Sequence, residues 1–117
     1  MNDSSTPRFL QGVLTFEGLG LDTPFRLDPA LTYTVPPGSS AQPVYFRGGN
    51  SSTEMVYVTL VRDGTAMRYF PIAAQGATHV SLRVVEDLLS DTVIEVFAAA
   101  PAGIVGSLVI DIGLVEI

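Results

Sequence analysis

Two β-type runs on either side of an Asp-Gly pair constrain the fold of this chain more than any other feature. Residues 55–61 and 66–72 are rich in β-branched and aromatic side chains, and Asp63-Gly64 lies between them. Asp and Gly tolerate the positive φ angles of a type I′ turn, which joins two antiparallel strands through a two-residue loop. We therefore predict a β-hairpin in the middle of the chain.

Short β-type runs with turn signals between them continue along the rest of the chain, and no segment shows the 3.6-residue period of a long helix. This pattern predicts an all-β fold of about eight strands, arranged as an antiparallel β-sandwich of the jelly-roll or immunoglobulin-like type. We expect one helical turn near residues 85–89, and strand ends at the Pro- and Gly-rich residues 36–40 and 48–52. The other expected strands are residues 9–16, 25–27, 31–35, 43–47, 78–84, 92–99 and 107–115.

The chain has 117 residues and no cysteine, which allows a single domain with a core that needs no disulfide. We expect residues 1–7 to form a flexible N-terminal segment and residues 8–117 to form the single β-sandwich domain. The polar N-terminus carries no signal pattern, and no apolar run approaches the ~18 residues of a membrane helix. We therefore expect a cytoplasmic protein without a membrane partner.

The chain is acidic, with a formal net charge of −6, and its 6 basic residues are scattered arginines. This argues against nucleic-acid binding, because that function needs a concentrated basic face. Charged residues make up only 15% of the chain, whereas hydrophobic residues make up 47%. On the roughly 6,000 Å² of surface expected for a monomer of this size, the charges are spaced at about one per 340 Å². So few charges favour a homo-oligomer, although Val- and Ala-rich β domains also score as hydrophobic.

The hairpin register predicts which side chains share a face. If Asp63-Gly64 is a two-residue loop, Val56, Val58 and Leu60 lie on an uncharged face that suits the core. The opposite face carries an arginine and should point outward, yet it is also rich in apolar groups. An apolar surface with aromatic anchors and isolated charge is typical of a subunit interface. The interface candidates are therefore Met55, Tyr57, Thr59, Arg68, Phe70 and Ile72.

Two alternatives remain open for this outward face. A loop or the second sheet of the same chain could cover it, and a longer hairpin loop would shift the register by one residue and exchange the two faces. The predicted strand at 92–99 has a similar composition. There Ile94 and Val96 suit a core face, whereas Glu95 and Phe97 mix charge with apolar surface on the other face.

Patterns for catalysis and metal binding are weak. His79 is the single histidine and no Gly-x-Ser-x-Gly elbow is present, so we expect no catalytic site and no enzyme activity. The loop with Glu86, Asp87 and Asp91 is the best calcium candidate, but it lacks the Asp-x-Asp-x-Asp spacing of a dedicated site. Capping of a turn by Asp87 or Ser90 explains the loop as well. We therefore expect no metal and no cofactor.

Aromatic side chains offer a second possibility, a platform on which a carbohydrate or another small ligand stacks. The rings of Tyr33 and Tyr45 could provide the stacking surface, and Arg47 could provide a polar contact. These three residues are the ligand-binding candidates. The chain contains no tryptophan, a strong stacking residue, and this weakens the carbohydrate hypothesis.

No motif is specific enough to identify a family, so function has to be inferred from surfaces. The low charge and the two-sided apolar hairpin favour a non-catalytic β-sandwich protein that self-associates and acts in assembly or protein interaction. The alternative is a small-ligand or carbohydrate-binding module, which requires a concave aromatic cleft.

Overall fold

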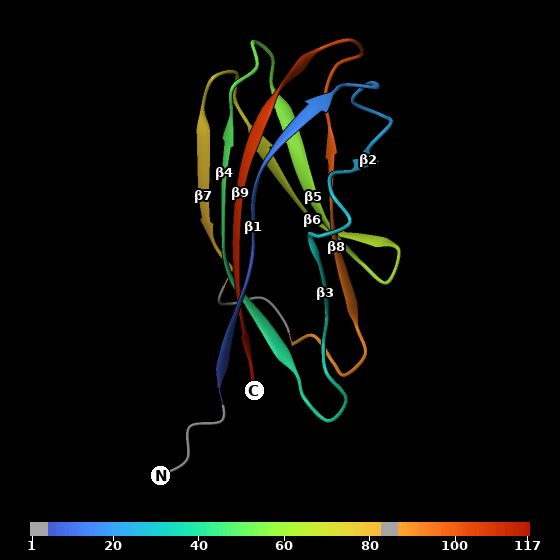
Figure 1. Cartoon of the computed structure of the whole chain (residues 1–117), viewed down its shortest axis with the longest axis vertical. Coiled ribbons are helices and arrows are strands. Elements are labelled where there is room, and N and C mark those ends of the chain that lie inside the picture. The colour runs from blue at the N-terminus through green and yellow to red at the C-terminus, as the bar shows by residue number, and fades with distance from the viewer. Residues whose placement is uncertain (1–4, 83–86) are drawn as a thin grey trace.

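The computed structural model describes residues 5–82 and 87–117, and it contains two antiparallel β-sheets packed face to face (Figure 1). The strands of sheet A are β1 (Thr6–Glu17), β4 (Ala41–Asn50), β7 (Ala77–Ser81) and β9 (Val105–Glu116). Those of sheet B are β2 (Phe25–Arg26), β3 (Thr32–Thr34), β5 (Val56–Arg62), β6 (Thr65–Ile72) and β8 (Val93–Ala99).

The strand order identifies the type of sandwich. Sheet A has the order β1-β9-β4-β7 and sheet B the order β2-β8-β5-β6, with the short β3 also pairing with β8. If β2 and β3 are counted as one interrupted strand, every connection crosses between the sheets except the β5–β6 hairpin. This is the arrangement of a jelly roll, built from two Greek keys. The prediction of an antiparallel β-sandwich is therefore confirmed, and of its two suggested types the topology is the jelly roll.

β1 begins at Thr6, which pairs with Glu116 at the end of β9. Thr6 and Pro7 are therefore strand residues, although the sequence placed them in a flexible segment. The predicted flexibility of residues 1–4 concerns positions outside the described residues. The same holds for part of the expected strand at 78–84 and of the expected helical turn at 85–89. Within the described part of that turn, Leu88 forms an isolated β-bridge with Ala41.

The β5–β6 turn has the predicted conformation. Asp63 and Gly64 have φ angles of 49° and 84°, and Arg62 pairs with Thr65 as expected for a two-residue loop. Farther from the turn the register shifts, because Leu60 pairs with Arg68 instead of Met67. A β-bulge thus adds one residue to β6, a device that bends a strand and changes which face its later residues occupy.

The bulge reverses the predicted orientation of the β6 side chains that follow it, whereas the core residues of β5 point as predicted. Val58 and Leu60 point into the core, as predicted, together with Val56. Phe70 and Ile72, however, are 3% and 0% exposed, so their predicted outward orientation is wrong. Side chains alternate along a strand, and one extra residue therefore moves every later side chain to the opposite face. The same shift turns Tyr69 outward, where it is 62% exposed.

β4 continues through Gly48 and Gly49 to Asn50, so the predicted strand end at residues 48–52 is wrong for its first three positions. A Cβ atom at Gly48 would lie 2.7 Å from both the Cδ1 atom of Ile72 and the Cζ atom of Phe46. A larger residue at position 48 would therefore force the side chain of Ile72 or Phe46 to move. The glycine here indicates close packing within a strand, although in the sequence alone the Gly-Gly pair looks like a turn signal.

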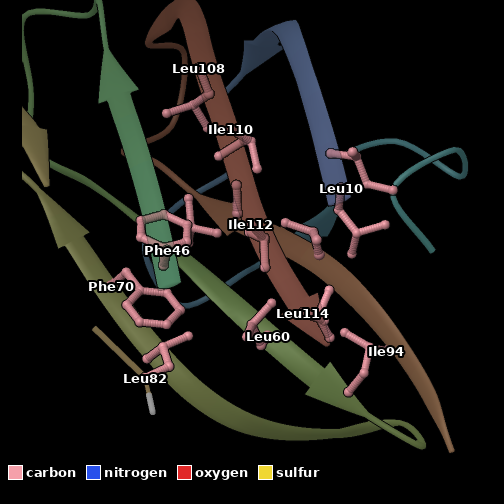
Figure 2. Close-up of a cluster of buried hydrophobic side chains, with 14 of the residues drawn as sticks. Leu10, Phe46, Leu60, Phe70, Leu82, Ile94, Leu108, Ile110, Ile112 and Leu114 are labelled. Atoms are coloured by element: carbon pink, nitrogen blue, oxygen red, sulfur yellow. The ribbon is translucent and has the colours of Figure 1, made fainter. Parts of the chain in front are cut away.

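The core lies between the two sheets and is built from alternating inward-facing side chains (Figure 2). Phe46 of β4 and Phe70 of β6 stack across it, with ring centroids 4.1 Å apart and ring planes within 4° of parallel. This contact joins sheet A to sheet B. Other members that Figure 2 labels are Leu10, Leu60, Leu82, Ile94, Leu108, Ile110, Ile112 and Leu114.

Candidate interaction surfaces

Two of the three ligand-binding candidates, Tyr45 and Arg47, lie next to each other on the outer face of sheet A. The guanidinium carbon of Arg47 is 5.0 Å from the centroid of the Tyr45 ring, which is cation–π distance. The Tyr45 hydroxyl donates to Oδ1 of Asp111 at 2.8 Å, and Nε2 of Gln11 donates to the same oxygen at 3.0 Å. This polar group therefore spans β1, β9 and β4.

Gly113 of β9 makes room for the Tyr45 ring, because a Cβ atom at this position would overlap Cε2 of Tyr45. His79 of β7 approaches the ring edge-on, with centroids 6.4 Å apart. Burial, followed by the hydrogen bond to Asp111, raises the pKa of Tyr45 above its ordinary value. The tyrosine thus stays a neutral donor that holds the Asp111 carboxylate in place.

Exposed apolar side chains surround this polar group on the outer face of sheet A. They form a ridge of exposed side chains on β1 and β9. Beside it lies a shallow depression of about 430 Å³, lined mostly by β4 and β7 but also by Val109 and Asp111 of β9. Gly49 and Ala77 are among the residues that line the depression. The outer face of sheet A thus combines exposed apolar side chains with a depression beside them. The ridge residues are Phe9, Val13, Val105 and Val109, which are between 51% and 74% exposed.

Tyr33, the third ligand-binding candidate, lies elsewhere and has a different partner. Its hydroxyl donates to Oε2 of Glu116 at 2.6 Å, and Nε of Arg8 donates to the same oxygen at 2.9 Å. Glu116 is only 8% exposed. The three side chains connect β3 of sheet B to β1 and β9 of sheet A, so Tyr33 serves to close the sandwich between the sheets.

We expect the Glu116 group to make folding stability pH-dependent. The hydrogen bonds from Arg8 and Tyr33 hold the pKa of Glu116 below its ordinary value. The contribution of Glu116 to the free energy of unfolding is therefore fully present above the pKa of the unfolded state, and it is lost as the pH falls through the pKa of the folded state. Burial and the hydrogen bond to Glu116 raise the pKa of Tyr33, so stability should also fall above about pH 10, where unfolded tyrosine ionises.

Urea unfolding of the wild type and of Glu116→Gln measures this contribution. The wild type should be more stable at pH 7, and the difference between the two proteins should shrink as the pH is lowered from 5 towards 3. A difference that stays constant over this range would contradict the assignment.

The six interface candidates do not form one exposed surface. Met55 is 43% exposed and Tyr57 is half-buried, whereas Thr59 is 3% exposed and donates its hydroxyl to the Arg68 carbonyl oxygen at 2.8 Å. Arg68 lines a depression between β6 and β7 that includes Val80 and Leu82. Phe70 and Ile72 are core residues and cannot contact a partner in the folded chain. Met55 and Tyr57 are thus the candidates whose side chains stay accessible on the outer side of sheet B.

A further depression, of about 250 Å³, lies on the outer face of sheet B. The pairing registers place Phe97 of β8 and Tyr69 of β6 on either side of Thr59 in β5. Tyr57 and Glu95 also line the depression. Tyr57, Glu95 and Phe97 were expected to point outward, whereas a hairpin without a bulge would place Tyr69 opposite Val58, on the core face. The bulge in β6 is what brings Tyr69 to this site.

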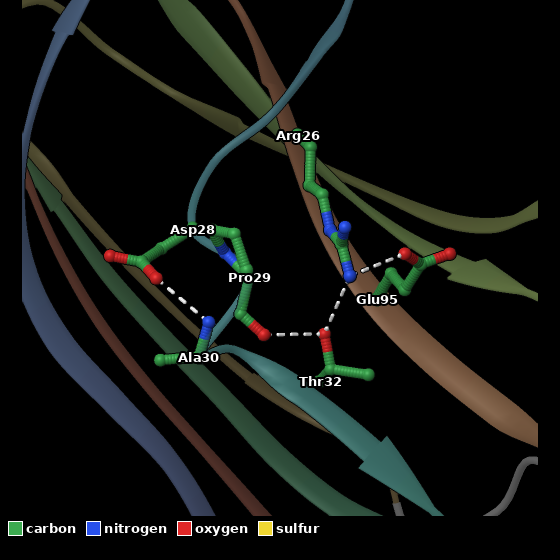
Figure 3. A network of polar contacts seen from close by, with 6 residues as sticks. All are labelled: Arg26, Asp28, Pro29, Ala30, Thr32 and Glu95. Atoms are coloured by element: carbon green, nitrogen blue, oxygen red, sulfur yellow. Dashed lines mark hydrogen bonds and ion pairs between the residues drawn. The ribbon is translucent and has the colours of Figure 1, made fainter.

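A polar network at the edge of sheet B holds Glu95 (Figure 3). Arg26 of β2 forms an ion pair with Oε2 of Glu95 at 3.0 Å and donates to the Thr32 hydroxyl at 3.2 Å. Asp28 accepts a 2.7 Å hydrogen bond from the backbone N–H of Ala30, which is the contact of an Asx turn at Asp28-Pro29. The network ties β2, β3 and the loop between them to β8.

The described residues of the acidic loop make structural contacts with neighbouring segments. Asp87 accepts a hydrogen bond from Gln42 at 2.7 Å, and the Ser90 hydroxyl bridges to the loop at 36–40 by donating to the Ser39 carbonyl. Glu86 lies outside the described residues. Within residues 5–82 and 87–117, no three His, Asp or Glu side chains gather closely enough to hold a metal ion.

Comparison with known proteins finds solved structures that resemble this chain in fold. The sequence matches no protein-family model and no curated protein. A chain from the structure of infectious bursal disease virus, Gt strain, superposes with a TM-score of 0.52 at 12% identity, over 97% of this chain and 33% of that one. A chain from Bacillus endospore appendages, a novel family of disulfide-linked pili, superposes over 99% of this chain and 91% of that one, with a TM-score of 0.48 at 12% identity.

The viral chain shares the β-sandwich fold, and the present chain spans a third of its length. In the part of the chain that the structure describes, no helix is long and apolar enough to cross a membrane.

Proposed function

We propose that this chain is a non-catalytic assembly protein that pairs with a second copy of itself through the outer face of sheet A. The observation that carries the proposal is the presence on this face of an apolar ridge on β1 and β9 beside a hollow that is lined mostly by β4 and β7. A face with both features can bind a copy of itself, because the ridge of each copy can enter the hollow of the other.

The size of the face is sufficient for a stable pair. At ~3.3 Å per residue and ~4.8 Å between strands, its four strands cover roughly 600 Å² in projection. A stable interface buries about 800 Å² of accessible surface on each partner, and accessible area exceeds projected area for a side-chain-covered sheet. The total accessible surface of 6168 Å² matches that expected for a monomer of this size, so the sparse charges are spread as thinly as the sequence indicated.

A two-fold axis between the faces, nearly parallel to the strands, gives complementary partners in each cross-strand row. Such an axis places β1 opposite the partner's β7, and β9 opposite the partner's β4. In one row, Val13 then meets the small Ala77 of the second copy, and Val109 meets Gly49. In another row, the exposed Phe9 faces Ser81 of the second copy. In these rows, large side chains of β1 and β9 thus face small residues of β7 and β4.

The cross-strand row that contains Asp111 and Arg47 also carries complementary charges. The registers align Gln11, Asp111, Arg47 and His79 across the sheet. The same two-fold axis places Asp111 of each copy opposite Arg47 of the other, which gives two reciprocal ion pairs near the centre of the interface. Within the described residues Arg47 forms no ion pair of its own. Opposite charges aligned in this way set the register of an interface.

Charge exchange tests this pairing by analytical ultracentrifugation from 1 to 200 µM. The wild type should be a dimer or a larger assembly, and Arg47→Asp or Asp111→Arg alone should weaken association at least tenfold, because like charges then face each other. The double variant Arg47→Asp/Asp111→Arg should recover most of the loss, because the two ion pairs are restored with their signs exchanged.

Tyr69→Arg is the matched control, because it places a charge on the outer face of sheet B. It should leave the association constant unchanged. A wild type that stays monomeric up to 200 µM would overturn the proposal, and so would a double variant no better than the single ones.

A further inference from the structure

We propose that the aromatic depression on the outer face of sheet B binds a quaternary ammonium group, such as that of choline. This site lies on the sheet opposite to the proposed self-association face, and the inference does not depend on that pairing. The residues that carry it are Tyr57, Tyr69, Phe97 and Glu95, around a floor that contains Thr59.

The strand registers build a three-sided aromatic enclosure. Phe97 and Tyr69 flank Thr59 on the two neighbouring strands, so their Cα atoms are about 10 Å apart across a short side chain. Tyr57 lies two residues before Thr59 on the same face and closes one end. The rings of Tyr57 and Tyr69 meet edge to face, with centroids 5.7 Å apart and planes at 63°. Rings set at such angles surround a rounded group from several sides.

One wall and the floor of the enclosure are held in place by hydrogen bonds that do not need a ligand. The Tyr57 hydroxyl donates to the Leu21 carbonyl oxygen at 2.8 Å, which fixes the ring against the loop before β2. The Thr59 hydroxyl is occupied by the Arg68 carbonyl oxygen, so Thr59 has no hydroxyl hydrogen left for a ligand. A preorganised site binds more tightly than one whose side chains must first become ordered.

The charge of the site favours a cation. Aromatic faces carry partial negative charge, and Glu95 adds a carboxylate at the open end, opposite Tyr57 along β5. Among the described residues, no Arg or His side chain lines the depression. Arg26 of β2 is the cross-strand neighbour of Phe97 and pairs with Oε2 of Glu95, so it competes with a bound cation for this carboxylate.

The shape distinguishes a cationic head group from a sugar. A sugar stacks on an open, flat ring face, whereas here the two tyrosine planes are inclined to each other by 63°. The volume of about 250 Å³ is also smaller than the ~300–1,000 Å³ of pockets for drug-sized ligands. A compact, rounded and positively charged group fits both properties.

Titration with choline, followed by NMR of the aromatic ring protons, tests the inference. We expect saturable shifts at Tyr57, Tyr69 and Phe97, with a dissociation constant on the order of 1 mM. The neutral isostere 3,3-dimethyl-1-butanol has the same shape without the charge and should bind at least fivefold more weakly. Glucose should produce no saturable shift.

Variants identify the contribution of each group. Tyr69→Ala changes an exposed residue and should weaken choline binding about fivefold, as expected for the loss of one cation–π contact. Glu95→Gln should also weaken it. Arg26→Ala should strengthen choline binding about twofold and leave the isostere unaffected, because it removes the competing cation. Leu89→Ala, an exposed apolar change outside the depression, is the control and should have no effect.

Three results would overturn the inference. These are the absence of saturable choline shifts, equal binding of choline and its neutral isostere, and unchanged choline affinity in Tyr69→Ala. Phosphatidylcholine vesicles distinguish the source of the group: cosedimentation that free choline abolishes supports a lipid head group, and binding of free choline without cosedimentation supports a soluble ligand.

Discussion

Phe70→Ala should lower the free energy of unfolding by about 3–5 kcal/mol, the cost typical of removing a buried phenylalanine. Phe70 is 3% exposed, and its ring stacks on Phe46 of the opposite sheet. The substitution would leave a cavity between the sheets and remove an aromatic pair that contributes ~0.5–1.5 kcal/mol beyond its buried area. Denaturant unfolding monitored by circular dichroism measures the loss.

Tyr69→Ala is the matched control for this prediction, because Tyr69 is the neighbouring residue on β6 and is 62% exposed. Its cost should stay within about 1 kcal/mol, as for most surface substitutions. The pair therefore tests the β-bulge directly. If the hairpin had a regular two-residue register, the two effects would be exchanged, and a larger loss for Tyr69→Ala would contradict the observed register.

Asn50→Ala should lower the free energy of unfolding by about 2–4 kcal/mol, because several buried polar groups would lose their partner together. Asn50 is 4% exposed. Its Nδ2 atom donates to the carbonyl oxygens of Glu54 at 2.8 Å and of Ala73 at 3.2 Å. Its Oδ1 atom accepts from the backbone N–H of Ser52 at 2.9 Å and from the Ser52 hydroxyl at 2.8 Å. Asn50 thus joins the β4–β5 loop to the β6–β7 loop.

Two further variants make the Asn50 prediction specific. Gln42→Ala removes an amide whose hydrogen bond to Asp87 is exposed, and it should cost no more than ~0.5 kcal/mol. Asn50→Asp keeps the acceptor atom but places a carboxylate beside carbonyl oxygens, so at pH 7 it should destabilise at least as much as Asn50→Ala. Thermal unfolding of the three variants decides the matter, and equal stability of Asn50→Ala and Gln42→Ala would contradict the prediction.

The proposed self-association face and the proposed cation site lie on opposite outer surfaces of the sandwich, and this makes them separable. Charge changes at Arg47 or Asp111 should alter association without altering choline binding. Changes at Tyr69 or Glu95 should do the reverse. An assembly built through sheet A would leave the sheet B depressions exposed on its outside, where each copy could bind a ligand.

The candidate site could be predicted only in part. Tyr45 and Arg47 were named as ligand-binding candidates for their residue types, and they lie side by side because residues two apart on a strand share a face. Tyr33 was grouped with them by residue type alone, and its position beside Glu116 depends on how β3 packs against the end of β9. Tyr69 was missed because nothing in the alternation of β6 marks the extra residue. A small Thr59 between outward aromatic residues was the available signal for the sheet B depression, and it is recognisable only once the register is known.

The sequence by itself determined the antiparallel sandwich, the Asp63-Gly64 turn and the acidic, sparsely charged surface. These properties depend on local turn chemistry, on alternation within single strands and on composition, so they need no knowledge of distant contacts. Only the tertiary structure decided the register of β6 beyond its bulge and the continuation of β4 through Gly48. Both faces of the hairpin are apolar, so a one-residue shift changes little in the local pattern. The packing of Phe70 and Ile72 against Phe46 and Gly48 in the opposite sheet selects one register, and it thereby determines which aromatic residues reach the surface.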